Sequence, residues 1–446
     1  MVGIGGIFAT DKMSCCMKIT KSVLLSCVLS LSCFAGFLQA QNDSTEDKSR
    51  LTIGGYGEAV FSRHFYSDNV FRYSHADRYK EAPAYSRLDL PHAVIMLGYD
   101  FGHGWSIGTE IEFEHGGIEA AVEKETEETG EFEQEIERGG EVALEQFWVQ
   151  KSFGKAFNIR AGHIVVPVGM TNANHLPTQF FGPYRPEGEN TIMPCTWHET
   201  GIALWGKAGS WRYEVQLLPA LNSNLFNDAG WVHNGSASPY EFRPANSLAG
   251  AARVDWTGVQ GLRLSVSGYI GNTFNNDITT TVYPETSRYY GATGTLLIGC
   301  FDFAYKNRWL TVRGNVDYGH LGDASLISTR NKNQTTMTGN PYPHTAVGES
   351  AWDASLETGV NLLAWSKTTA KLYLFGRYDH YDSFVPAEGW TDVEWAERQV
   401  VSAGVNYYPL PEIAIKAEGG IRLLPSQYNN EPYFALGITW AGFFKK

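Results

Sequence analysis

FALGITWAGFF, residues 434–444, is the stretch that decides the fold. In an extended chain successive side chains point to opposite faces, and one face here carries the large apolar side chains of Phe434, Leu436, Ile438, Trp440 and Phe444. The preceding stretch, IAIKAEGGIRL (413–423), repeats the pattern, with Lys416, Glu418 and Arg422 on its polar face. A period of two, not 3.6, therefore governs this region and predicts β-strands.

The same alternation extends towards the N-terminus in segments about ten residues long, the length a tilted strand needs to cross a bilayer. Sixteen strands are predicted, near 52–62, 88–99, 104–114, 142–152, 157–166, 200–208, 211–219, 248–257, 262–271, 291–305, 310–318, 353–364, 369–380, 399–408, 413–423 and 434–444. The segments at 88 and 142 alternate poorly, because Val94 and Met96, or Leu144 and Trp148, fall on the nominally polar face.

Connections between these segments alternate between short and long. Short turns are expected near 100–104, 153–156, 208–210, 258–261, 306–308, 365–368 and 409–412. A globular sandwich has no reason to collect its long loops at one end, whereas an outer-membrane barrel has tight periplasmic turns and long external loops. We predict an all-β, transmembrane, antiparallel up-and-down barrel of about 16 strands, in which the last strand closes on the first.

The N-terminus resembles an export signal. Lys18 and Lys21 precede an apolar run, 23–38, followed by Leu-Gln-Ala, which is the plan of a secretory signal peptide. Residues 1–40 are expected to be an upstream extension and signal peptide, residues 41–50 a short periplasmic segment, and residues 51–446 the barrel. These features favour the outer membrane of a Gram-negative bacterium, and the aromatic last strand resembles the signal read by the barrel assembly machinery.

Composition and motifs limit the function classes. A net charge of −13 argues against a nucleic-acid partner. Cys195 and Cys300 lie past the signal, and their spacing indicates neither a zinc site nor a redox motif; one disulfide or two free thiols both stay open. We find no sequence motif for catalysis, a cofactor or a metal, and expect no enzyme activity.

Charged side chains on the polar faces of the strands would line a barrel lumen. The residues expected there are Glu110, Glu112, Glu114, Arg160, Arg212, Arg253, Arg263, Arg313, Lys371, Arg377, Lys416 and Arg422. Fixed charges along a narrow pore select among ions. Pairing of arginine with glutamate across strands, to hold the wall together, is an equal alternative.

The connection 167–200 is the longest and is rich in proline and aromatic residues, which predicts an ordered loop. In the segments 159–169 and 185–201 the chain resembles the phosphate-selective porin O and P-like outer-membrane channels. The order of strands and loops extends this resemblance to residues 51–446. The resemblance implies a third external loop that folds inward and narrows the pore. Candidate constriction residues are then His175, Arg185, Glu187, Glu189, His198 and Glu199. The alternative is that they pin the loop to the wall.

The expected function is passive diffusion of small hydrophilic or ionic solutes. Phosphate selectivity is not carried over from the resemblance, because lumenal lysines are few beyond Lys371 and Lys416. A monomer stays open beside the homotrimer that the resemblance implies. The acidic stretch 119–141 could bind cations that bridge lipopolysaccharide, attract cations to the pore mouth, or be a solvated loop.

Two other functions stay open. A surface-binding barrel, an adhesin or glycan receptor, would use external aromatics such as Tyr66, Phe71 and Tyr73. A barrel hydrolase would need a nucleophile, a base and an acid at the rim, for which His64, His75 and Asp77 are the available residues; sixteen strands are more than such enzymes usually have.

Overall fold

The computed structural model describes residues 50–81, 84–115, 123–124, 134–135, 141–238, 242–277, 283–333 and 343–445, all within one compact unit, residues 49–446. Its main sheet is built from β1 (Leu51–His64), β2 (Tyr85–Asp89), β3 (His92–Gly102), β4 (Trp105–Glu114), β7 (Glu141–Ser152), β8 (Asn158–Val165), β9 (His198–Ala208), β10 (Trp211–Pro219), β11 (Leu248–Trp256), β12 (Leu262–Asn272), β13 (Thr295–Lys306), β14 (Leu310–Leu321), β15 (Ser350–Asn361), β16 (Lys371–Val385), β17 (Glu397–Leu410), β18 (Ile413–Leu423) and β19 (Glu431–Lys445). The two-residue strands β5 (Glu123–Lys124) and β6 (Gln134–Glu135) pair separately.

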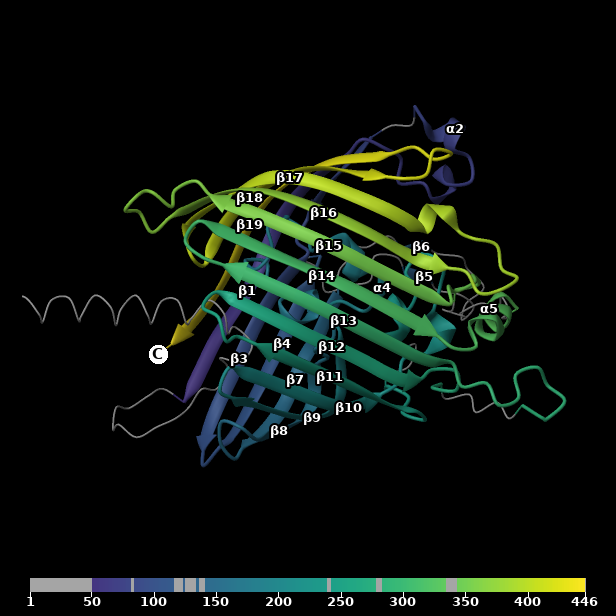
Figure 1. Ribbon diagram of the computed structural model, residues 1–446, viewed down its shortest axis with the longest axis horizontal. Helices are drawn as coiled ribbons and strands as arrows, with labels where there is room; N and C mark the ends of the chain where they lie inside the picture. The colour runs from purple at the N-terminus through teal and green to yellow at the C-terminus, as the bar shows by residue number, and fades with distance from the viewer. Residues whose placement is uncertain are drawn as a thin grey trace, which may run out of the picture. The chain divides into compact units, whose positions relative to one another are not determined.

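The sheet closes on itself because β1 pairs antiparallel with β19 on one side and with β2 and β3 on the other (Figure 1). β2 and β3 follow one another along β1 and are separated only by Leu90 and Pro91. Proline has no N–H to donate to a ladder, which accounts for the break. Counting this pair as one strand reduces the seventeen strands of the sheet to sixteen. The predicted closed antiparallel barrel is confirmed.

The two faces of the sheet follow the alternation seen in the sequence. Apolar side chains such as Val266 and Ile270 are exposed on the outward face, at 60% and 54%. Their neighbours Ser265, Ser267 and Tyr269 are buried on the inward face. Because β1 pairs with β19 on one side and with β3 on the other, the ring of strands has no free end.

A β-bulge explains why the segment at 142 alternates poorly. Glu110 pairs with Gln146, but Ile111 pairs with Leu144, so Glu145 is an extra residue in β7. The bulge reverses the phase of the strand: Leu144 faces outward before it, whereas Trp148 faces inward after it. In β3, by contrast, the alternation is regular, and Val94 and Met96 are simply apolar residues buried on the inward face.

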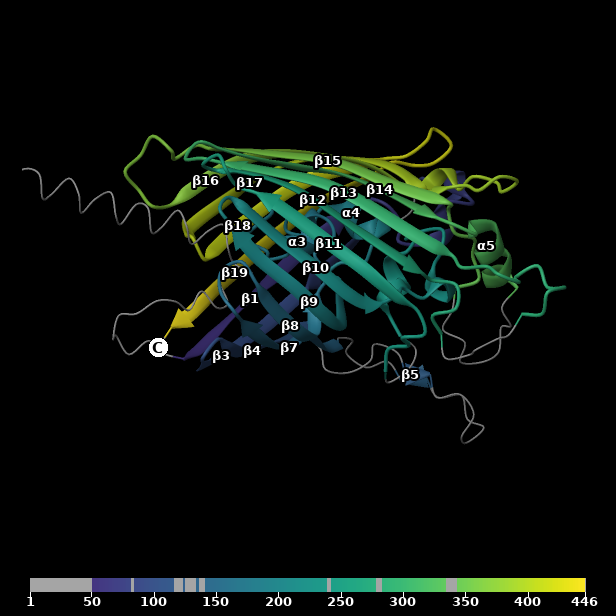
Figure 2. The ribbon, with the colours of Figure 1, turned by 60° about the horizontal axis from the view of Figure 1, so that its bottom comes forward.

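Connections alternate in length around the barrel. The long ones carry the short helices η1 (Val70–Arg72), α2 (Ala76–Tyr79), α3 (Met170–Ala173), α4 (Glu187–Ile192), η2 (Ser223–Leu225), η3 (His233–Ser236), α5 (Ala324–Lys332) and η4 (Glu394–Ala396). Helices α3 and α4 lie inside the barrel, where α4 contacts β15 and β16 (Figure 2). None of the helices in the described residues is long and apolar enough to cross a membrane.

Candidate functional site: the inward loop 166–197

The loop between β8 and β9, residues 166–197, is held from widely separated strands. On β18, the buried Lys416 donates from Nζ to the carbonyl oxygens of Pro177, Phe180 and Gly182 at 2.5, 2.9 and 2.8 Å. On β11, Arg253 donates from Nη1 to the carbonyl of Gly169 at 2.9 Å. Six strands, β12 to β17, separate β11 from β18, so the loop crosses the interior and is not folded back against one part of the wall.

Glu187, at the start of α4, is a second anchor. Its carboxylate accepts from Arg422 Nε at 2.6 Å and from the hydroxyl of Tyr381 at 2.5 Å, and lies 3.6 Å from Arg398. Burial alone would raise the pKa of Glu187, but Arg422 and Arg398 outweigh it and lower the pKa to about 2. Glu187 is therefore ionised at neutral pH and joins the loop to β16, β17 and β18.

Glu189 organises the loop internally. Its carboxylate accepts from the backbone N–H of Met170 at 2.5 Å and of Thr171 at 2.7 Å, and from the Thr171 hydroxyl. These are the first N–H groups of α3, which otherwise has no side-chain cap. Gly169 sits beside this carboxylate with φ +87°, and a Cβ there would meet Glu189 Oε1 at 1.9 Å. Glycine is thus required where the loop begins.

Arg185 lies between the loop and the β1–β4–β7 part of the wall. Two of its guanidinium nitrogens, Nε and Nη2, are buried without a hydrogen-bond partner in the described part of the chain. Burial alone lowers the pKa of Arg185, but the nearby Cys195 thiol and Tyr56 hydroxyl, followed by the carboxyl groups of Glu145 and Glu112, raise it overall. The side chain therefore stays cationic and keeps N–H donors that the surrounding side chains do not use.

His175 is buried at 1% exposure and faces the same part of the wall. Its Nδ1 lies 3.2 Å from the carbonyl oxygen of Asn172, and its ring lies 6.0 Å from that of Tyr56 on β1. Burial lowers the pKa of His175 to about 4, which leaves the imidazole neutral at pH 7.

The remaining two candidates, His198 and Glu199, are not in the loop but are the first residues of β9. Glu199 is on the inward face and accepts from Arg243 Nη2 at 3.0 Å. His198 shares the outward face of β9 with exposed Ile202, and its Nδ1 lies 2.5 Å from Nε2 of His163 on β8. This corrects the expectation for His198, because strand alternation directs it away from the loop.

The twelve charged residues expected on the wall all lie on inward faces of their strands. Most of the arginines are paired. Arg253 Nη2 lies 2.8 Å from Asp302, Arg313 Nη2 lies 2.5 Å from Glu357, and Arg377 Nη2 lies 2.7 Å from Glu418. Pairing across strands thus accounts for much of the basic charge, as the alternative interpretation held.

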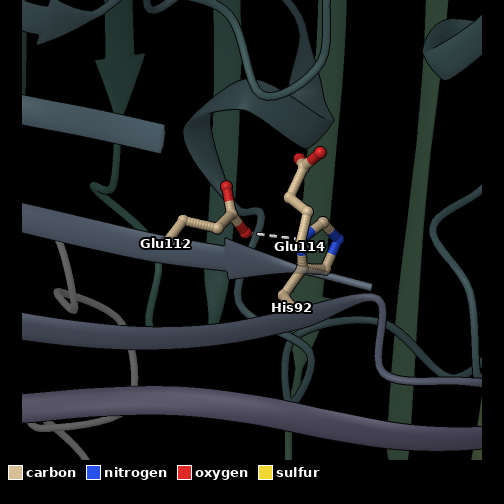
Figure 3. Close-up of side chains that lie close together, drawn as sticks. All are labelled: His92, Glu112 and Glu114. Carbon is tan, nitrogen blue, oxygen red and sulfur yellow. Dashed lines mark hydrogen bonds and ion pairs between the residues drawn. The ribbon is translucent and has the colours of Figure 1, made fainter. Parts of the chain in front are cut away.

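An acid and histidine cluster on β1, β3, β4 and β7 was missed in the sequence. It contains His92, whose Nδ1 lies 2.5 Å from Glu112 Oε1 (Figure 3) and whose Nε2 lies 3.7 Å from Glu58. Although the sequence has no metal-binding motif, the described residues include two groups with ligand atoms within 4.8 Å of one another: His92, Glu112 and Glu114, and Glu110, Glu145 and His175. Strand pairing brings the acids and His92 together, and the inward loop adds His175.

The cysteines, the acidic stretch and the external aromatics singled out in the sequence are placed by the structure as follows from their contacts and exposure. Cys195 and Cys300 are both free thiols. The stretch 119–141 lies almost entirely outside the described residues. Of the external aromatics, Phe71 is 59% exposed, but Tyr66 is buried and its hydroxyl oxygen accepts from Arg422 Nη1 at 2.6 Å, and Tyr73 stacks on Trp395 at 4.7 Å.

The three residues considered for a barrel hydrolase lie in or next to β1 and α2. His64 contacts the hydroxyls of Ser62 and Tyr66 at 3.1 Å each. Asp77 lies in α2, and His75 immediately precedes that helix. The contacts of His64 are thus with the strand and loop next to it, and they connect it to neither of the other two residues.

Comparison with known proteins supports the architecture. The described fold is similar to that of an anion-selective porin from Comamonas acidovorans, with TM-score 0.50, 11% identity, and coverage of 88% of this chain and 99% of that one. It is also similar to OmpF of Salmonella typhi in complex with daunomycin, with TM-score 0.51, 10% identity, and coverage of 87% and 97%. In sequence, an uncharacterized protein of Aquifex aeolicus (strain VF5) is 26% identical over 421 residues, 91% of this chain and 83% of that protein.

No family model matches the sequence. The likeness to solved structures is a likeness of fold, and it agrees with the strand count, the closure and the antiparallel order derived above. The chain has the fold of a general sixteen-strand porin-like β-barrel.

Proposed function

We propose that this protein is an outer-membrane channel for passive diffusion of small hydrophilic or ionic solutes, with the loop 166–197 as its constriction. The observation that carries the proposal is the anchoring of one loop across the interior of a closed barrel, by Lys416 on one side and Arg253 on another. A loop held in this way narrows the lumen of the barrel. Fixed charges beside a narrow passage act on passing ions.

Arg185 is the proposed selectivity residue. It is a cation with unused N–H donors next to Glu112 and Glu145, so the passage beside it has charges of both signs and weak net selectivity. The proposed channel is similar to the phosphate-selective porin O and P-like channels and assembles as a homotrimer. It is inserted by the barrel assembly machinery, contacts lipopolysaccharide in the outer membrane, and has no enzyme activity.

Single-channel recording in a planar bilayer under a salt gradient tests the proposal. The wild type is expected to give stable conductance steps, and Arg185→Ala is expected to move the reversal potential towards that of a cation channel, because acidic neighbours then dominate. Arg308→Ala is the matched control, since Arg308 lies in the turn before β14 and donates to the Ser366 carbonyl at 3.0 Å. No steps from folded protein would refute a channel; steps with an unmoved reversal potential would refute the role of Arg185.

A further inference from the structure

A buried group of three side chains joins the loop to the wall. Glu110 comes from β4, Glu145 from the bulge of β7, and His175 from the loop after α3. They are 2%, 1% and 1% exposed, and one ligand atom from each lies within 4.8 Å of the other two. The bulge is what directs Glu145 inward beside Gln146, so the group depends on a local departure from regular strand pairing.

The two carboxyl groups of this site are in contact. Glu110 is within hydrogen-bonding reach of Glu145, and so is Glu112. Oε1 of Glu110 is buried and meets no donor in the described residues. Carboxylates this close, away from water, need a shared proton or a cation between them. Arg185 is near, but in the part of the chain that the structure describes it forms no ion pair within 4.0 Å with Glu110 or Glu145, and the acids outnumber it.

Each of the three side chains is also held in place by a hydrogen bond to a neighbouring group. The Nδ1 of His175 faces the Asn172 carbonyl at 3.2 Å, which favours the tautomer whose lone pair is on Nε2. Tyr56 donates its hydroxyl to Glu145 Oε2 at 3.2 Å, and Gln146 donates to Glu110 Oε2. A histidine whose second nitrogen donates to a carbonyl, and carboxylates held by neighbouring donors, are the arrangement found around metal ligands.

We propose that Glu110, Glu145 and His175 bind one divalent transition-metal ion, of the Zn²⁺ class, that cross-links the inward loop to the barrel wall. Imidazole nitrogen with carboxylate oxygen suits Zn²⁺, whereas Ca²⁺ and Mg²⁺ take oxygen ligands. Ligand distances of about 2.0–2.2 Å put two ligand atoms at most about 4.4 Å apart, so small side-chain rotations complete the site. Three protein ligands leave one position for water.

The test is zinc binding by the folded full-length protein in detergent, stripped with a chelator and dialysed back. Elemental analysis gives the stoichiometry and titration calorimetry the affinity. The wild type is expected to bind one Zn²⁺ per chain and to melt at a higher temperature with zinc. His175→Gln is expected to weaken binding by at least roughly 100-fold, because it removes a ligand, whereas loss of a residue that only orients a ligand costs about 10–100-fold. His233→Gln is the matched control, because the Nδ1 of His233 also faces a backbone carbonyl, that of Met193, at 2.9 Å.

Heat-modifiable migration on a gel shows that each variant is folded. If His175→Gln does not fold, Glu110→Gln, which has the same shape without the charge, replaces it and is expected to lose zinc equally. Wild-type protein that binds no zinc would overturn the proposal in favour of a shared proton. Zinc that survives both substitutions but is lost in His92→Gln would overturn it in favour of the neighbouring group on β3 and β4.

Discussion

Replacing Lys416 with methionine is expected to release the inward loop. Three carbonyl oxygens of the loop accept from its Nζ, and the side chain is 0% exposed. A buried acceptor left without a donor costs about 1–3 kcal/mol. Since methionine also removes the cost of burying an ammonium group, the low end applies, and three acceptors amount to about 3 kcal/mol. At about 1.4 kcal/mol per decade, the population of released loop rises roughly 100-fold.

Limited proteolysis with chymotrypsin measures that population. The enzyme can cleave after Phe181 or Tyr184 only when the loop has left the interior, and the cleavage rate follows the open population when opening and closing are fast. Lys371→Met is the matched control, because Lys371 begins β16 on the same inward face but makes none of these loop contacts. A cleavage rate for Lys416→Met within about threefold of the control would refute the anchoring argument.

Two further predictions concern the loop. The folded-state pKa of Glu187 is lowered to about 2, below its ordinary 4.5, so the anchoring by its carboxylate is complete above pH 4.5 and is lost as the pH falls through 2. Loop-opening events in single-channel records should become more frequent as the pH falls over that window. Glu187→Gln should show such events already at pH 5. Gly169→Ala should destabilise the loop by about 1–3 kcal/mol, from its positive φ and the clash with Glu189, and speed chymotrypsin cleavage; Gly299→Ala, with open space at its Cβ, should not.

The strands were predictable because period-two alternation is a local property of the chain. A strand that is apolar on one face and polar on the other has one orientation in a barrel wall, and the sequence shows it without reference to any neighbour. The residues of β18 and β19, for example, could be assigned to their faces from the letters alone. Strand ends were less predictable: β16 continues to Val385, five residues past the predicted end, since the barrel rim, not the pattern, sets where pairing stops.

The candidate site was predictable only in part. His175, Arg185, Glu187 and Glu189 could be singled out because they lie in the longest and most proline-rich connection. Their partners could not, because Glu187 meets Arg422 across 235 positions of sequence, and nothing local in the chain encodes that contact. The orientation of His198 could not be predicted either, because it depends on where β9 begins. A residue before that point belongs to the loop, whereas His198 lies on the outward face of the strand.

The sequence by itself determined the class of the protein: alternation, segment length and alternating loop length specify an antiparallel barrel, since each follows from the pleat and the span of a single strand. Only the tertiary structure decided that the loop 166–197 crosses the interior, and that the bulge at Glu145 turns a second acid towards Glu110 and His175. The physical reason is that closure joins residues far apart in sequence, and a one-residue shift in pairing reverses which face a side chain occupies.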